Sequence, residues 1–389
     1  ISKYLTVSQT VDQDYTGWIR SSNNDSGRLS LRKDGAARLT LSGSTSYDGY
    51  THVREGMLEF KGYSKSSRYD IDLNAAVEFD VAAGVTRDMP TTSFNGQGTL
   101  RKTGDGTIMW GTGAASFNLA SQSVIDVQAG VLVAGSYGNE NWTNNKADVN
   151  IGSTGTFRTV EANVIIDALT GDGTFTTGYS GWASSPVIGV DNGSGTFAGR
   201  IVDTGGIHVN RNLIKVGTGT QILSGNNSYA GVTQVQNGTL QIGDGGTSGT
   251  LGRGEVIITN GTLAFNRSDA LALTQRITSA GADYPDISNQ NRINTLVYDQ
   301  ATLTGSIVQR GTGTTTLTNN GNNSPVQTVV EKGRLVYNTT TTTTKGIEVW
   351  SGATAELGAT LADFTHTAGI TYTGAGTVLR NAPATAGSF

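Results

Sequence analysis

The residues of this chain that could carry out chemistry are few and scattered. It has three histidines, His52, His208 and His366, and no cysteine, so thiolate nucleophiles, thiolate metal sites and disulfides are excluded. The sequence contains no Gly-x-Ser-x-Gly, His-Glu-x-x-His or Walker-type motif. We therefore expect a protein that is not an enzyme, with no catalytic residue, no cofactor and no metal site.

Carboxylates are the remaining candidates for acid–base chemistry. A polysaccharide lyase or hydrolase needs acidic or basic residues gathered on one face. Acidic residues occur at apparent turns and strand ends, at Asp167, Asp172, Asp191 and Asp203. The sequence brings no two of them to one face, so we expect solvated turn residues and keep a polysaccharide-cleaving enzyme as an alternative.

Aromatic and amide side chains in two irregular segments are the stronger candidates for binding. The segments are YGNENWTNNK at 137–146 and TGYSGWASSP at 177–186. Aromatic rings can stack on sugars while neighbouring amides hydrogen-bond to hydroxyl groups. The candidate ligand-binding residues are Tyr137, Asn139, Asn141, Trp142, Tyr179 and Trp182. The alternative is that these rings fold back and cover the core.

Two further tryptophans, Trp110 and Trp350, lie within strand patterns. We expect both to be core or ladder residues. His52 also lies inside a repeated strand, where a surface position is expected.

The composition indicates a folded chain with a polar, weakly charged surface. Glycine contributes 54 residues, proline 5, and charged residues only 15%. Such chains can be disordered, but here the 36% of hydrophobic residues alternate with polar ones as in β-strands. The net charge of −4 and the lack of a basic run exclude a nucleic-acid track, and no apolar run is long enough for a membrane helix.

An internal repeat determines the expected architecture. The stretch 214–242, IKVGTGTQILSGNNSYAGVTQVQNGTLQI, matches 32–60 without a gap. The shared residues include Lys33/Lys215, Gly35/Gly217, Tyr47/Tyr229, Gly56/Gly238 and Leu58/Leu240. Weaker copies begin near Arg101 and Gln309. Repetition of short alternating segments indicates a stack of similar units.

The spacing of the repeated Asn-Gly-Thr-Leu motif, at 237–240 and 260–263, fits one turn of a β-solenoid. We expect an all-β parallel β-helix with about 17 coils of roughly 22 residues, each about 4.8 Å from the next. Residues 1–26 would start or cap the solenoid, 27–380 would form it, and 381–389 would be a tail or linker. The stretch 268–277 fits either a short helix or an outlying strand.

The segment 217–265 resembles the passenger-associated transport repeat of bacterial autotransporters. It has the Gly-Thr-Gly-Thr opening, Leu-Ser-Gly, the Asn-x-Tyr-x-Gly turn at Tyr229 and the closing Asn-Gly-Thr-Leu. The copy at 35–60 lacks the opening, and those at 104–133 and 311–337 lack the tyrosine turn. The resemblance implies a right-handed parallel β-helix that is exported across a Gram-negative outer membrane.

This resemblance leads to our expected function, a non-enzymatic cell-surface or secreted passenger acting in adhesion or cell aggregation. Its partners would be glycans or surface proteins of host or neighbouring cells, or copies of itself. Neither nucleic acid binding nor membrane insertion by this segment is expected. A structural subunit that assembles into an extracellular fibre or surface layer is the main alternative.

Overall fold

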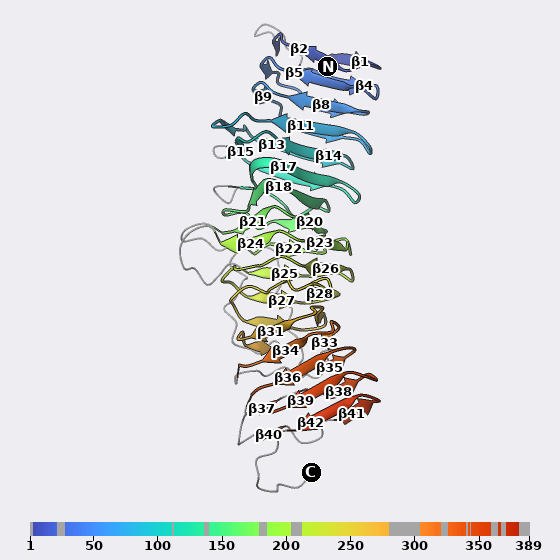
Figure 1. Cartoon of the computed structure of the whole chain (residues 1–389). Coiled ribbons are helices and arrows are strands. Elements are labelled where there is room, and N and C mark those ends of the chain that lie inside the picture. Colours follow the sequence, from blue (N-terminus) through green and yellow to red (C-terminus); the bar gives the residue numbers. More distant parts are fainter. Residues whose placement is uncertain are drawn as a thin grey trace. The chain divides into compact units, whose positions relative to one another are not determined.

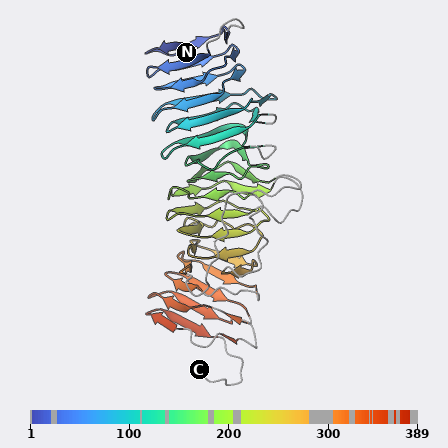
Figure 2. The same cartoon turned by 180° about the vertical axis from the view of Figure 1, so that it is seen from behind.

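The computed structural model describes residues 3–21, 28–110, 113–135, 140–178, 185–203, 212–279, 304–319, 326–339, 341–342, 344–358, 365–366 and 371–380. Every regular element in these ranges is a β-strand, and the pairing between strands is parallel, so the strands of successive turns lie one above another (Figures 1 and 2). The described residues include no helix that could span a membrane. The chain divides into two units, Ile1–Asp191 with Gly199–His208, and Asn192–Ala198 with Val209–Phe389.

The first unit has several parallel sheets that repeat along the stack. One sheet comprises β1 (Lys3–Ser8), β4 (Leu29–Asp34), β7 (Thr51–Val53), β10 (Arg68–Ile71), β13 (Thr92–Gly96) and β16 (Ala115–Leu119). A short sheet comprises β3 (Ile19–Arg20), β6 (Thr45–Ser46) and β9 (Ser64–Lys65). A pair is formed by β19 (Ile165–Ile166) and β22 (Val187–Ile188).

Two long strands of the first unit, β17 (Val124–Val133) and β18 (Asp148–Arg158), each join two rows of shorter strands. The register between them shifts at Val127/Ala129. One row comprises β2 (Gln13–Tyr15), β5 (Arg38–Leu41), β8 (Met57–Phe60), β11 (Ala76–Asp80), β14 (Thr99–Thr103) and β20 (Leu169–Gly171). The other comprises β12 (Thr86–Asp88), β15 (Thr107–Met109), β21 (Thr174–Thr177) and β24 (Arg200–Asp203).

The second unit repeats the same plan with three rows and one pair. Its longest row comprises β23 (Gly195–Phe197), β26 (Thr220–Leu223), β28 (Thr239–Ile242), β30 (Thr262–Phe265), β33 (Ser306–Gln309), β35 (Gln327–Val330), β38 (Gly346–Val349) and β41 (Thr371–Gly374). A second row comprises β25 (Leu213–Lys215), β27 (Thr233–Val235), β29 (Val256–Ile258) and β32 (Ile277–Thr278). The third comprises β31 (Ala270–Leu273), β34 (Thr314–Leu317), β36 (Arg334–Tyr337), β39 (Thr354–Leu357) and β42 (Thr377–Arg380). The pair is β37 (Thr341–Thr342) and β40 (Thr365–His366).

The predicted parallel β-solenoid is confirmed, and the strand alternative for 268–277 is correct because β31 lies there. The structure has about 13 turns, fewer than the 17 expected. One reason is that the length of a turn varies. Thr262 of β30 pairs with Ser306 of β33, 44 residues later, which is about twice the ordinary step.

The interior is filled by identical or similar side chains in register. Phe60 pairs with Phe79 and their rings stack at 5.5 Å. The rings of Tyr69 and Phe94 stack at 5.2 Å in the same way. Such ring pairs contribute about 0.5–1.5 kcal/mol each beyond the burial of their surface. The parallel register therefore converts a repeated inward position into a continuous aromatic core.

The lysine of the repeat is buried and stabilises a turn. Lys215 is 1% exposed, and its Nζ donates hydrogen bonds to the carbonyl oxygens of Val216, Gly217 and Asn237. Gly217 has a φ of 65°, a conformation that favours glycine. The same three-carbonyl arrangement occurs at Lys33 and Lys102. In the fourth copy Gln309 Nε2 donates to the carbonyls of Gly311 and Gly313 instead.

The tyrosine of the repeat is also an interior residue. Tyr229 is 0% exposed, and its hydroxyl lies 2.7 Å from Thr233 Oγ1. Tyr47 makes the equivalent contact with Thr51. The two residues that most clearly mark the repeat, the lysine and the tyrosine, thus serve the fold and are not available to a ligand.

We predict that Lys215→Met lowers the free energy of unfolding by roughly 2–3 kcal/mol, because three turn carbonyls lose a charged donor. Lys215→Gln should retain part of that stability, since Gln309 makes comparable bonds in the fourth copy. Urea unfolding followed by circular dichroism measures both. The exposed Lys332, changed to Met, is the control; equal midpoints for Lys215→Met and wild type would contradict the turn-stabilising role.

Candidate functional site

An outward column of polar residues crosses the first unit from β5 to β17. Its register runs Thr40, Glu59, Glu78, Arg101 and Asp126. Apolar residues flank these polar residues in the same strands and face the interior, as Leu58 and Phe60 do on either side of Glu59 in β8. Because side chains alternate along a strand, the polar residues face outward. The three carboxylates are nevertheless only 3%, 4% and 5% exposed in chain order, because side chains from adjacent turns cover them.

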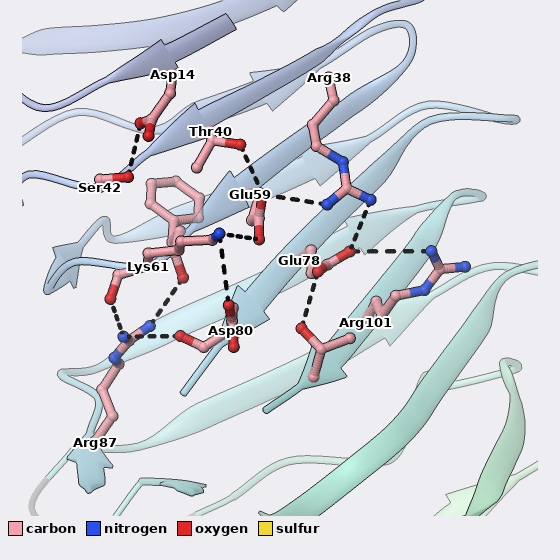
Figure 3. A network of polar contacts seen from close by, with 12 residues as sticks. Asp14, Arg38, Thr40, Ser42, Glu59, Lys61, Glu78, Asp80, Arg87 and Arg101 are labelled. Atoms are coloured by element: carbon pink, nitrogen blue, oxygen red, sulfur yellow. Dashed lines mark hydrogen bonds and ion pairs between the residues drawn. The ribbon is translucent and has the colours of Figure 1, made fainter. Parts of the chain in front are cut away.

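Basic side chains bridge these carboxylates from turn to turn (Figure 3). Arg38 lies 3.2 Å from Glu59 Oε2 and 3.8 Å from Glu78 Oε2. Arg101 lies 3.9 Å from Glu78 and 2.8 Å from Asp126 Oδ2. Hydroxyl donors complete the network, with Thr40 and Thr103 donating to Glu59 and Glu78 at 2.7 and 2.8 Å. Each carboxylate therefore has both a cation and a hydrogen-bond donor.

This network gathers acidic residues on one face, which is the arrangement required by the enzyme alternative. A general acid must present its proton to a substrate, whereas Glu59 and Glu78 are covered and engaged by arginine, lysine and threonine side chains. Their geometry is that of a ladder that ties successive turns together. The described residues also include no group of three or more histidine, cysteine or acidic residues placed to hold a metal ion.

The four aspartates considered for catalysis have structural partners. Asp167 Oδ1 accepts a hydrogen bond from the Asp191 backbone at 2.7 Å, and Asp203 accepts one from Thr177 at 3.0 Å. Asp191 also contacts Ser121 and lies 2.8 Å from Lys146, and the Lys146 bond lowers the pKa of Asp191. The backbone of Asp172 donates to Ile151 in a turn.

A second outward face, on β1, β4, β7 and β10, combines aromatic rings with ion pairs. The rings of Tyr4 and Tyr50 meet edge to face at 5.7 Å, and the Arg68 guanidinium lies 5.7 Å from the centre of the Tyr50 ring. Arg68 is paired with Asp70 at 2.7 Å. His52 has the expected strand position and lies 2.9 Å from Asp72. Charges on this face are therefore largely satisfied within the protein.

Trp142, a predicted ligand-binding residue, lies in the core. It is 2% exposed, its ring stacks on Phe117 at 3.8 Å, and its Nε1 donates to the Ala134 carbonyl at 3.2 Å. The expectation of a surface ring is corrected here, and the alternative of a ring folded onto the β-helix applies. The indole packs between Phe117 and Phe157 and so continues the aromatic core.

Of the other candidate residues, only Asn141 lies within the described ranges. Its side chain is half-buried and its Oδ1 accepts hydrogen bonds from the backbone and hydroxyl of Thr143, at 3.0 and 2.7 Å, so it shapes a local turn. The candidates outside the described residues are Tyr137, Asn139, Tyr179 and Trp182. Of the six candidate ligand-binding residues, the structure therefore describes two: Asn141, which stabilises a turn, and Trp142, which lies in the core.

Exposed aromatic residues occur instead beside short strands, outside the two segments that the sequence singled out for binding. Trp18 is 70% exposed, Tyr63 45% and Trp350 49%. Of the two tryptophans predicted to be core or ladder residues, Trp110 lies in the core at 1% exposure. Trp350 lies outside the core, and its Nε1 donates to Glu348 at the surface. Alternation could have indicated that Trp18 is exposed, because it directly precedes Ile19, which is buried.

We predict that Trp142→Ala lowers the free energy of unfolding by about 3–5 kcal/mol, because removing a buried indole leaves a cavity. Asn144→Ala changes an exposed residue of the same segment and should leave stability unchanged. Urea unfolding monitored by tryptophan fluorescence and circular dichroism compares the two. A Trp142→Ala protein as stable as wild type would argue against its core role.

Comparisons with known proteins agree with the repeat pattern. The family described as passenger-associated-transport-repeat matches residues 31–60, 213–242 and 307–336. The chain is 42% identical over 93 residues to the adhesin BmaC autotransporter of Brucella suis biovar 1 (strain 1330), a match that spans 24% of this chain and 3% of that protein. No solved structure matches. The repeats and the similarity to this relative support an autotransporter passenger, and the parallel solenoid is the β-helical fold expected of one.

Proposed function

We propose that this chain is a non-enzymatic, adhesive passenger segment exported across the outer membrane of a Gram-negative-type bacterium and exposed at the cell surface or released from it. The observation that carries the proposal is the 42% identity, over 93 residues, to a protein named as an autotransporter adhesin. Because the match spans 3% of that protein, the similarity supports the type of function and not a particular partner.

The distribution of side chains supports contact through the outer surface. The repeat's lysine and tyrosine and the aromatic rings of the core are buried, so the polar and aromatic groups open to a partner lie on the outward faces of the turns. The buried carboxylates of β8, β11 and β17 are bound by arginines and threonines, which suits a rigid supporting ladder better than acid catalysis. Glycans or surface proteins are the proposed partners.

A binding assay with the purified chain tests this function. We expect saturable binding to intact cells or to an array of glycans, with competition by excess unlabelled protein. Absence of binding to cells, glycans and surface proteins would overturn adhesion. Filaments or ordered layers in electron micrographs, without cell binding, would favour the fibre-forming alternative.

A polysaccharide-cleavage assay tests the non-enzymatic part of the proposal. We expect no release of reducing ends or unsaturated products from a panel of polysaccharides. Cleavage that is lost in Glu59→Gln or Glu78→Gln would show that the acidic ladder is catalytic. A Glu348→Gln variant, changed at an outward position of the second unit, serves as the control.

A further inference from the structure

The short sheet formed by β3, β6 and β9 carries two columns of outward side chains in the first unit. Ile19 pairs with Thr45, and Thr45 pairs with Ser64. These three side chains are at most 8% exposed and face the interior. Since side chains alternate along a strand, the residues immediately before and after them face solvent. The sheet belongs to the N-terminal turns drawn in blue (Figure 1).

The residues before the buried positions form an aromatic column. They are Trp18, Ser44 and Tyr63, and their equivalence is fixed by hydrogen bonds from Ile19 N to Ser44 O at 3.2 Å and from Thr45 N to Tyr63 O at 2.7 Å. Trp18 is 70% and Tyr63 45% exposed. The backbones that carry the two rings are two ladder steps apart, about 9.6 Å. The small Ser44 side chain between them leaves room for a ligand.

A similar column nearby shows a different arrangement. Tyr4 and Tyr50 are also two turns apart, with Ser30 between them, yet their rings contact each other at 5.7 Å. Among the residues that the structure describes, the rings of Trp18 and Tyr63 make no such contact. The Trp18–Tyr63 column is therefore open where the Tyr4–Tyr50 column is closed.

The residues after the buried positions form a basic column. Arg20, Ser46 and Lys65 are in register, and all three are exposed. The Arg20 guanidinium lies 5.9 Å from the centre of the Trp18 ring, a cation–π arrangement that connects the two columns.

Among the residues that the structure describes, the cations of this basic column have no acidic partner, unlike several arginines of the first unit. Within the described part of the chain, neither Arg20 nor Lys65 forms an ion pair. Arginines that do pair with carboxylates are Arg32, Arg38, Arg54, Arg68 and Arg101. Arg20 and Lys65, separated by Ser46 and without an ion pair among the described residues, give this surface positive charge for an external anion.

We propose that this surface, the Trp18–Tyr63 face, binds an acidic glycan whose chain lies along the stacked turns. The proposal deepens the adhesive function proposed above and rests on it. The apolar faces of two sugar units would pack on the Trp18 and Tyr63 rings, while carboxylate or sulfate groups pair with Arg20 and Lys65. The hydroxyls of Ser44 and Ser46 lie between them as hydrogen-bonding groups.

Charge favours a glycan over a nucleic acid for this face. Single-stranded nucleic acid also stacks on aromatic rings, but it requires a basic groove that follows many phosphates. This face offers two cations, Arg20 and Lys65, on a chain with a net charge of −4. Two cations match the one or two acidic groups of a short glycan segment.

The test uses the whole chain and three polysaccharide probes, polygalacturonate with carboxylates, chondroitin sulfate with both carboxylates and sulfates, and neutral dextran. We expect binding to at least one acidic probe by isothermal titration calorimetry, weakened by added salt, and none to dextran. Trp18→Ala and Tyr63→Ala should each weaken binding about tenfold or more, and the double variant Arg20→Glu, Lys65→Glu should abolish it.

Matched controls change equivalent residues elsewhere. Trp350→Ala removes an exposed indole that is bonded to Glu348, and Lys332→Glu reverses an exposed cation of the second unit; both should bind as wild type does. The altered residues of the face are exposed, so unfolding midpoints should stay unchanged, which separates lost contacts from lost folding.

Several results would overturn the proposal. One is that the Trp18→Ala protein and the Arg20→Glu, Lys65→Glu protein bind the acidic probes with wild-type affinity. Others are that dextran binds as well as the acidic probes, that a thymidine oligonucleotide binds more tightly than they do, or that neither acidic probe binds. Cell adhesion that persists in the Trp18→Ala and Arg20→Glu, Lys65→Glu proteins would place adhesion elsewhere and leave the proposed function intact. If the wild-type protein itself does not adhere to cells, both the glycan-binding proposal and the proposed adhesive function are rejected.

Discussion

Parallel register between successive turns is the constraint on which this structure depends. Each residue lies directly over its equivalent in the next turn, so a position that faces inward once faces inward throughout the local stack. Phe60 over Phe79 and Tyr69 over Phe94 build the core in this way. Outside, the same rule sets Glu59 over Glu78. Arg38 bridges these two carboxylates, and Arg101 connects Glu78 to Asp126.

The turns between strands require a second kind of stabilisation. Carbonyl groups converge where the chain bends at glycines of positive φ, and an unpaired buried carbonyl is costly. Lys33, Lys102 and Lys215 satisfy these groups with one ammonium each, and Gln309 does so with an amide. The buried lysine and tyrosine of the transport repeat therefore stabilise turns and the core. The residues open to a partner lie on the outer faces.

Outward faces of similar backbone geometry differ in what they offer a partner. On the ladder of β5, β8, β11 and β14 the charges compensate one another, and on the Tyr4–Tyr50 column the rings close on each other. At Trp18 and Tyr63 the rings stand apart beside Arg20 and Lys65. The same backbone thus carries faces whose charges and rings contact one another and a face, the Trp18–Tyr63 face, whose rings and cations are open to the proposed glycan. The difference lies in the side chains at equivalent positions and not in the solenoid.

The sequence by itself determined the parallel solenoid, because both of its signals can be read without a structure. One is the alternation of apolar and polar residues within strands, and the other is the set of residues shared by 32–60 and 214–242. The strand pattern around Trp110 also predicted a core or ladder position for it, and it lies in the core. Only the tertiary structure decided which rings are exposed. Trp142 lies in a segment without strand pattern yet stacks on Phe117 in the core, and Trp350 follows a strand yet faces solvent. Both outcomes depend on neighbours from other turns, which local sequence does not specify.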